Sequence, residues 1–341
     1  MSDRLTHLRL LPVLTLLGVV ATLLTGCSEQ GSEAPAAPSP QLAKAKPSAG
    51  NGPQQQRQQT RQKARQKNRQ KRGRTQPAPE PVVEEKLRIV SLSPALTQIL
   101  LDMGQGDALV GRTRFAPPGV ESVPVVGDLR DPDLERLSAV APDLLVVQPP
   151  AGGIDVSLKM LARAQECEIA AWRIDRLSDV SRIVNELPDV IQRVGGDPKH
   201  ARAAGAVWRA RMGTLLVPDQ SVAQAGRVLM LFAVDPPAAF GKETYLDDML
   251  RAFGGRNAIQ RPGYPVLSLE DLLVLAPDSI LVLAPDARRA EDQAESLREQ
   301  LGSAGQHLPI VPVDGENLLV PGTRLLKGAE VFKSTFSEGE Q

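Results

Sequence analysis

A ten-residue segment that occurs twice restricts the fold of this chain more than any other feature. Residues 134–143 read LERLSAVAPD, and residues 269–278, 135 positions later, read LEDLLVLAPD. A run of apolar residues follows each copy. A second pair of similar segments, 103–109 and 253–259, lies 150 positions apart. Because the two offsets differ, the pattern predicts two related lobes that differ in a loop, and it excludes a solenoid of short repeats.

Short apolar strands alternate with helices in each half of the chain. In the first half we expect strands at 88–92, 108–111, 123–126 and 144–147, and a helix that opens at 93–94. Strands that are apolar throughout and separated by helices favour a mainly parallel sheet covered on both faces. We therefore predict an α/β fold of two Rossmann-like lobes with a ligand cleft between them.

A helical connector is predicted between the lobes. Apolar residues recur at helical spacing from Ile183 to Val194, although Pro188 must start a new helix or kink this one. After a Gly-Gly-Asp-Pro break we expect one long helix of about 20 residues, near 30 Å in length. Such a helix is rigid, so the lobes should move little. The predicted domains are a first lobe at 87–177, the connector at 178–217 and a second lobe at 218–341.

The N-terminus has the layout of a secretory signal. Two arginines precede an apolar run at 10–24, which at 15 residues is shorter than the roughly 20 that a membrane-spanning helix needs. The tetrad LTGC at 24–27 resembles a bacterial lipobox. That resemblance implies removal of residues 1–26, lipidation of Cys27 and a mature protein tethered to a membrane outside the cytoplasm. A plain signal peptide or an N-terminal membrane anchor are the alternatives.

Lipidation of Cys27 would leave Cys167 as the remaining one of the two cysteines. No intramolecular disulfide is then expected. Cys167 lies in an apolar stretch and is predicted to be a buried small hydrophobic residue rather than a nucleophile.

Residues 27–86 differ in composition from the remainder of the chain. Pro, Ala, Ser and Gln dominate, and nine Lys and Arg residues lie at 57–74, many in a four-residue RQKx repeat. Like charges four positions apart repel in a helix, so we predict a disordered, extended tether. The alternative is that 57–74 binds anionic lipid or a cell-wall polymer. Nucleic acid is not an expected partner outside the cell.

Several motifs, taken in their order, carry a family resemblance. They are RIVSLSP at 88–94, GQGDALVG at 104–111, the two repeat copies, and PGTRLLKG at 321–328. The chain resembles the class III solute-binding proteins, the extracytoplasmic receptors of ABC importers for cobalamin, ferric siderophores and haem, over roughly residues 88–333. The resemblance implies two α/β lobes joined by one long helix. It also implies a monomeric receptor that captures a metal chelate, either cobalamin or a ferric siderophore, and delivers it to a permease powered by an ATPase.

Glu135 and Glu270 occupy equivalent places in the two repeat copies. The resemblance implies that each docks onto arginines of the permease, so that two carboxylates on separate lobes form a two-point contact. The alternative reading is that an acidic residue in the first turn of a helix complements the helix dipole.

The predicted ligand cleft consists of loops at the carboxyl ends of the strands. Cations and aromatic rings there would suit a large, partly anionic ligand. The candidates in the first lobe are Ser93, Arg114, Phe115, Asp128, Arg130 and Gln148. Those in the second lobe are Phe232, Asp235, Phe240, Lys242, Tyr245, Arg261 and Tyr264. Trp172 and Trp208 are expected in the core.

Other functions are less well supported. Three histidines argue against a histidine-built metal site, so any metal should arrive inside its own chelator. The Gly104-x-Gly106 pair follows a helix rather than a strand, no P-loop is present, and no serine has a recognisable histidine partner, so neither an enzyme nor an intrinsic cofactor is predicted. Two alternatives stay open: an envelope interaction lipoprotein that uses the same fold without transport, and a haem-binding lipoprotein in which Tyr245 or Tyr264 ligates iron.

Overall fold

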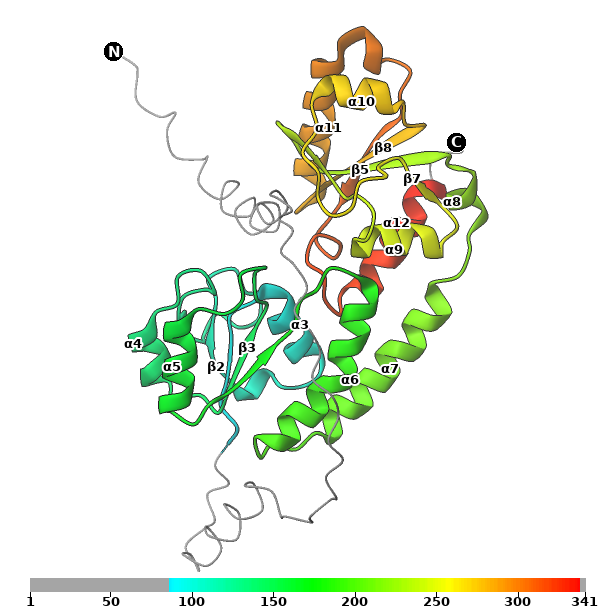
Figure 1. The fold of residues 1–341 in the computed structure, drawn as a ribbon. Coiled ribbons are helices and arrows are strands. Elements are labelled where there is room, and N and C mark those ends of the chain that lie inside the picture. Colours follow the sequence, from blue (N-terminus) through cyan, green and yellow to red (C-terminus); the bar gives the residue numbers. More distant parts are fainter. Residues whose placement is uncertain (1–85, 338–341) are drawn as a thin grey trace, which may run out of the picture. The chain divides into compact units, whose positions relative to one another are not determined.

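The computed structural model describes residues 86–337, and Figure 1 shows their ribbon. The predicted signal sequence, the lipidated Cys27 and the basic segment 57–74 lie outside the described residues and stay predictions. Within 86–337, no helix is both long and apolar enough to cross a membrane.

The first lobe is built on a parallel sheet of four strands. In chain order these are β1 (Ile89–Ser91), β2 (Leu109–Arg112), β3 (Leu144–Val147) and β4 (Glu168–Ala171). Their order across the sheet is β2-β1-β3-β4. Every residue of β1 and β3 is buried, as expected for central strands with both faces covered.

One predicted strand of this lobe, at 123–126, is wrong. The structure contains only a single bridge there, between Arg112 and Val125. Pro124 accepts a hydrogen bond from the backbone N–H of Arg112 but has no N–H of its own with which to continue the ladder.

Helices cover the first sheet. They are α3 (Pro94–Asp102), the 3₁₀ turn η1 (Gly106–Ala108), α4 (Leu134–Ala139) and α5 (Val156–Ala164). The predicted helix start is confirmed, because Ser93 caps α3 and its hydroxyl accepts a hydrogen bond from the N–H of Leu96 at 3.4 Å. Pro94 stands at the first helical position, where a missing N–H leaves nothing unpaired.

The second lobe repeats this arrangement. Its strands are β5 (Arg227–Val234), β6 (Pro237–Ala239), β7 (Arg256–Asn257), β8 (Ser279–Ala284) and β9 (Ile310–Asp314). Apart from the antiparallel β6, the order β7-β5-β8-β9 matches the order of the first sheet. Its helices are α8 (Gln220–Gln224), α9 (Tyr245–Ala252), α10 (Leu269–Leu275), α11 (Ala287–Leu301), the turn η2 (Gly302–Gly305) and α12 (Leu325–Ser337). The predicted fold class of two related α/β lobes is confirmed.

The sequence repeat corresponds to the same local structure in both lobes. Asp143 accepts a hydrogen bond from the backbone N–H of Arg88 at 2.9 Å, and Asp278 accepts one from the N–H of Arg227 at 2.7 Å. In each copy the alanine of the Ala-Pro-Asp triplet is left-handed, with φ of 39° and 42°. Each aspartate therefore ties the end of its repeat to the start of its lobe's first strand.

The segment between the sheets contains two helices, one on each side of the predicted Gly-Gly-Asp-Pro break. They are α6 (Leu177–Arg193) and α7 (Lys199–Leu215), each of 17 residues, and they pack against each other. Pro188 lies inside α6. Because proline has no backbone N–H, the carbonyl of Val184 receives no helical hydrogen bond from this position. Gly205 of α7 lies against that carbonyl, at a place where a Cβ atom would be 3.2 Å from the oxygen.

The apolar core runs across the lobes and the connector. One cluster joins alternate residues of the first sheet, such as Ile89 and Leu144, to the buried faces of α6 and α7 and to the second sheet. The opposite faces of the two sheets have separate clusters. Trp172 and Trp208 are both buried, which confirms their predicted place in the core.

Candidate ligand-binding site

A small cavity of about 80 Å³ lies where parts of both lobes meet. The first lobe contributes the start of α3 and the residue that follows β3, and the second lobe contributes four aromatic side chains and the segment before α12. The lining residues are Pro94, Ala95, Gln148, Phe232, Phe240, Tyr245, Tyr264, Leu319, Val320 and Pro321.

The aromatic wall is a packed cluster. The ring centroid of Phe240 lies 5.1 Å from that of Phe232 and 5.6 Å from those of Tyr245 and Tyr264, with all three pairs edge to face. These are four of the ten aromatic residues in the whole chain. These four rings share one wall, where flat, polarizable surfaces can pack against a ligand.

The two tyrosine hydroxyls are neutral donors at this wall. Burial raises the pKa of Tyr245 and that of Tyr264 well above the usual value near 10. Neither hydroxyl makes a hydrogen bond to another residue that the structure describes, although Tyr245 is only 2% exposed. Each is therefore available to donate a hydrogen bond to a ligand.

Gln148 is the polar side chain of the first-lobe wall. The hydroxyl of Ser93 donates to its carboxamide oxygen at 3.0 Å. Ser93 itself is buried and lies behind the lining rather than in it. The carboxamide N–H₂ of Gln148 has no partner among the described residues, so it adds a third donor to the cavity.

The other predicted ligand residues are not part of this lining, and their ligand roles stay predictions. Arg114 is exposed and lies 5.7 Å from the ring of Phe115. Asp128 accepts hydrogen bonds from the backbone of the next turn, including the N–H of Arg130.

The remaining three candidates belong to the second lobe. Asp235 is exposed at the turn between β5 and β6, and Arg261 is exposed. Lys242 is half-buried, and its backbone pairs with that of Arg261. The walls of this cavity thus differ from the predicted mixture of cations and aromatics, because no charged side chain lines it.

Sequence reasoning missed half of the lining. Pro94 and Ala95 are predicted only as a helix start, and nothing in the sequence singles out Leu319 and Val320. Pro321 opens the PGTR motif, which the sequence alone does not place in the fold. This motif is the one signal that could have pointed to the segment before α12.

A family model described as periplasmic binding protein matches residues 89–301. The chain belongs to the periplasmic binding protein family.

Individual relatives of this periplasmic binding protein are distant. One from Bacillus subtilis, named an uncharacterized ABC transporter substrate-binding lipoprotein, is 23% identical over 268 residues, covering 75% of this chain and 83% of that protein. A vitamin B12-binding protein from Salmonella paratyphi A is 23% identical over 257 residues, covering 74% of this chain and 90% of that protein.

Solved structures agree on the fold. The periplasmic vitamin B12-binding protein of Vibrio cholerae superposes with a TM-score of 0.59 at 20% identity, covering 74% of this chain and 98% of that one. A periplasmic heme-binding protein from Roseiflexus gives a TM-score of 0.60 at 23% identity, covering 75% of this chain and all of the other.

The two predicted docking residues of this binding protein are both exposed. Glu135 lies in the first turn of α4 and Glu270 in the first turn of α10. The helices are capped by Asp133 and Ser268, so neither glutamate is needed as a cap. Both carboxylates are therefore free to meet a partner, and their docking role stays a prediction.

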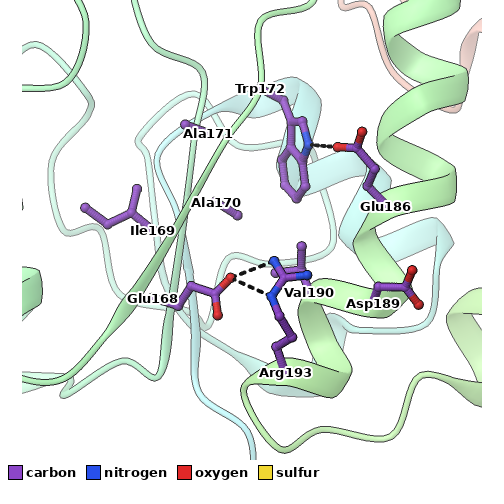
Figure 2. A pocket seen from close by; sticks show the side chains of 9 residues that line it. All are labelled: Glu168, Ile169, Ala170, Ala171, Trp172, Glu186, Asp189, Val190 and Arg193. Carbon is purple, nitrogen blue, oxygen red and sulfur yellow. Dashed lines mark hydrogen bonds and ion pairs between the residues drawn. The ribbon is translucent and has the colours of Figure 1, made fainter. Parts of the chain in front are cut away.

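A larger groove, of about 310 Å³, lies elsewhere, between the edge strand β4 and α6. Figure 2 shows two interactions that span it: the indole N–H of Trp172 donates to Glu186 at 2.7 Å, and Arg193 pairs with Glu168 at 2.8 Å. None of the predicted ligand residues lines this groove. Its side chains tie α6 to the sheet, and polar groups dominate its walls.

Two of the predictions concern a metal site and the thiol of Cys167. Within the described part of the chain, no group of three or more His, Cys, Asp or Glu side chains could hold a metal ion. Cys167 is half-buried, and its thiol donates to the carbonyl of Glu168 at 3.4 Å.

Cys167 is expected to resist thiol reagents in the folded protein. Burial, the largest cause, raises the pKa of its thiol to about 12, so at pH 8 only about 10⁻⁴ of it is thiolate. Modification by a chromogenic disulfide reagent at pH 8, in a C27S variant, should be negligible until denaturant is added. Rapid modification without denaturant would contradict the conclusion that burial keeps the Cys167 thiol protonated.

Proposed function

We propose that this protein is the substrate-binding protein of an ABC importer and that it carries an uncharged, amide-rich metal chelate of the cobalamin type. The family assignment supports a solute receptor that acts outside the cytoplasm and catalyses no reaction. The observation that carries the choice of ligand is the cavity wall, which has four aromatic rings and no charged side chain.

An uncharged wall favours cobalamin over a ferric siderophore of high negative charge. A multiply anionic ligand would lose its hydration at this wall without gaining a cationic partner, which is costly. A corrin ring can instead pack on the aromatic faces, and its peripheral amide carbonyls can accept hydrogen bonds from Tyr245, Tyr264 and Gln148.

Delivery to the importer is the second part of the proposal. Glu135 and Glu270, exposed on separate lobes, would meet basic residues of the permease, and the energy for transport would come from the partner ATPase. A lipid on Cys27 would hold the receptor at the membrane, with residues 28–86 as its tether.

Calorimetry of the full chain tests the ligand assignment. The panel contains cobalamin, a ferric hydroxamate, a ferric catecholate and haem, and we expect cobalamin to bind and the ferric catecholate to give no heat. The Y264F variant removes one donor and keeps the ring, so cobalamin affinity should fall about two- to tenfold. A Phe336→Tyr variant, altered on α12 outside the cavity, is the matched control.

Two outcomes would overturn this assignment. Tight binding of the catecholate with no binding of cobalamin would mean that the aromatic wall does not select the ligand. A haem complex with a tyrosinate-type absorption spectrum that Y264F or Y245F abolishes would favour the haem-binding alternative.

A further inference from the structure

A segment of the second lobe reaches across to the first lobe and the connector. Thr323 is 3% exposed, and its hydroxyl donates to a carboxylate oxygen of Asp102, the last residue of α3, at 2.5 Å. The indole N–H of Trp208, on α7, donates to the backbone carbonyl of Thr323 at 2.8 Å. The tip of the segment 315–324 is thus held by two hydrogen bonds from outside its own lobe.

The base of the same segment is fixed to the second lobe. The N–H of Gly315 donates to the carbonyl of Ala284, the last residue of β8, at 2.7 Å. At the other end the chain enters α12 at Leu325. Between base and tip, Leu319, Val320 and Pro321 form one wall of the ligand cavity. The segment is therefore a strap that closes the cavity from one side.

The cavity is too small for the proposed ligand. Sites for drug-sized ligands have volumes of about 300–1,000 Å³, whereas this one has about 80 Å³. One wall must therefore move before a chelate can enter. The aromatic wall is an unfavourable choice, because Phe240 and Tyr245 are each only 2% exposed and belong to the continuous core.

The outer part of the strap is the wall that moves at the lowest free-energy cost. Val320 is 36% exposed and Leu319 and Pro321 are half-buried, whereas Leu318 is fully buried in the continuous core and stays in place. The contact between Gly322 and α3 also leaves a buried polar atom without a hydrogen bond to any described residue. The side-chain oxygen of Gln98 is buried there without a hydrogen-bond partner among the described residues, while its nitrogen donates to Asp102 at 3.0 Å. An unpaired buried acceptor destabilises the closed arrangement relative to an open one in which water reaches it.

We propose that the strap 315–324 is a gate of the ligand site and that Asp102 and Thr323 are the positioning residues that latch it. This inference rests on the proposed function, because it concerns entry to the same cavity. When the latch opens, Leu319, Val320 and Pro321 swing away and the cavity widens on the side where Val320 is already exposed. When it closes over a ligand, the same three residues cover the face opposite the aromatic rings.

Stopped-flow kinetics of cobalamin binding to the full chain tests the gate. The T323V variant keeps the side-chain volume and removes the donor, and D102A removes the acceptor at an exposed position. The latch holds the strap closed in the ligand-free protein and in the ligand-bound protein. We therefore expect association and dissociation each to be about three- to tenfold faster, with Kd changed by less than about twofold. The T323V/D102A double variant should match D102A alone, because D102A already removes the bond to Thr323 together with the bond from Gln98.

The controls separate a gate from a merely structural bond. T214V is the matched control, since the exposed Thr214 hydroxyl donates to the carbonyl of Arg211 within α7 and takes no part in the latch. It should leave both rates unchanged. If a latch variant changes Kd and thermal stability but its association and dissociation rates do not rise together, the Thr323–Asp102 bond has a structural role only. Unchanged rates in T323V would overturn the proposal.

Hydrogen exchange on the ligand-free protein gives a readout that does not depend on the ligand. Amides of 318–324 should exchange faster in T323V and D102A than in wild type or T214V. If wild type binds no chelate of the panel but this change is seen, the ligand assignment fails and the latch stands. If cobalamin binds and exchange of the strap is the same in all variants, the latch fails and the proposed function stands.

Discussion

Replacing Glu135 and Glu270 together by lysine is expected to abolish ligand uptake by cells that depend on this protein, while the affinity for ligand stays unchanged. Both side chains are exposed, on α4 and α10 of different lobes, and neither lines the ligand cavity. Reversal of each charge turns an attraction to a basic permease surface into repulsion at two points. Uptake of labelled ligand is the measurement, with calorimetry of the same variants for affinity.

A matched control separates loss of docking from a general effect of the added positive charge. Glu291 and Glu299 are exposed on α11, away from the two repeat copies, and their double reversal adds the same charge to the protein. It should leave uptake near the wild-type level. The E135Q/E270Q variant should already lower uptake strongly, whereas a role confined to the helix dipole would alter only stability. Normal uptake by E135K/E270K would rule out docking through these residues.

The second large effect is expected from Phe240→Ala. The Phe240 ring is 2% exposed and makes edge-to-face contacts with Phe232, Tyr245 and Tyr264. Loss of a buried phenylalanine leaves a cavity and lowers the free energy of unfolding by about 3–5 kcal/mol. The same change removes the centre of the aromatic wall, so cobalamin affinity should also fall by more than tenfold. Denaturant unfolding and calorimetry measure the two effects.

Phe115→Ala provides the comparison for this prediction. Phe115 is only half-buried and lies beside Arg114 rather than in the aromatic cluster. Its removal should change the free energy of unfolding by less than about 1 kcal/mol. A loss below about 1 kcal/mol for Phe240→Ala as well would mean that the aromatic wall is not tightly packed in solution.

Local sequence signals were sufficient for most of the secondary structure. The strand at 144–147 was predicted to the residue, because a four-residue apolar run between two breaks is too short for a stable helix and favours a buried strand. Ser93 and Pro94 marked the start of α3 for equally local reasons. The strand expected at 123–126 failed because Pro124 stops the ladder, although its neighbours are apolar.

Proline also shows where local reasoning is insufficient. Pro188 was expected to divide or kink a helix, and it lies inside α6, where Gly205 of α7 packs close to the carbonyl that the proline leaves without a donor. No local pattern shows that the two helices meet at this point. A distant contact also links Ser93 to the cavity, because its hydroxyl donates to the lining residue Gln148 although Ser93 is not itself in the lining.

The sequence by itself determined two related α/β lobes, their mainly parallel sheets and the start of α3, because apolar periodicity, caps and an internal repeat are properties of short segments. Only the tertiary structure decided which loops line the same ligand cavity. The cavity joins Pro94 to Pro321, and the latch joins Asp102 to Thr323 across 221 positions. Contacts between such distant residues depend on how the two sheets and the connector pack around one continuous core, and no local pattern in the chain records that packing.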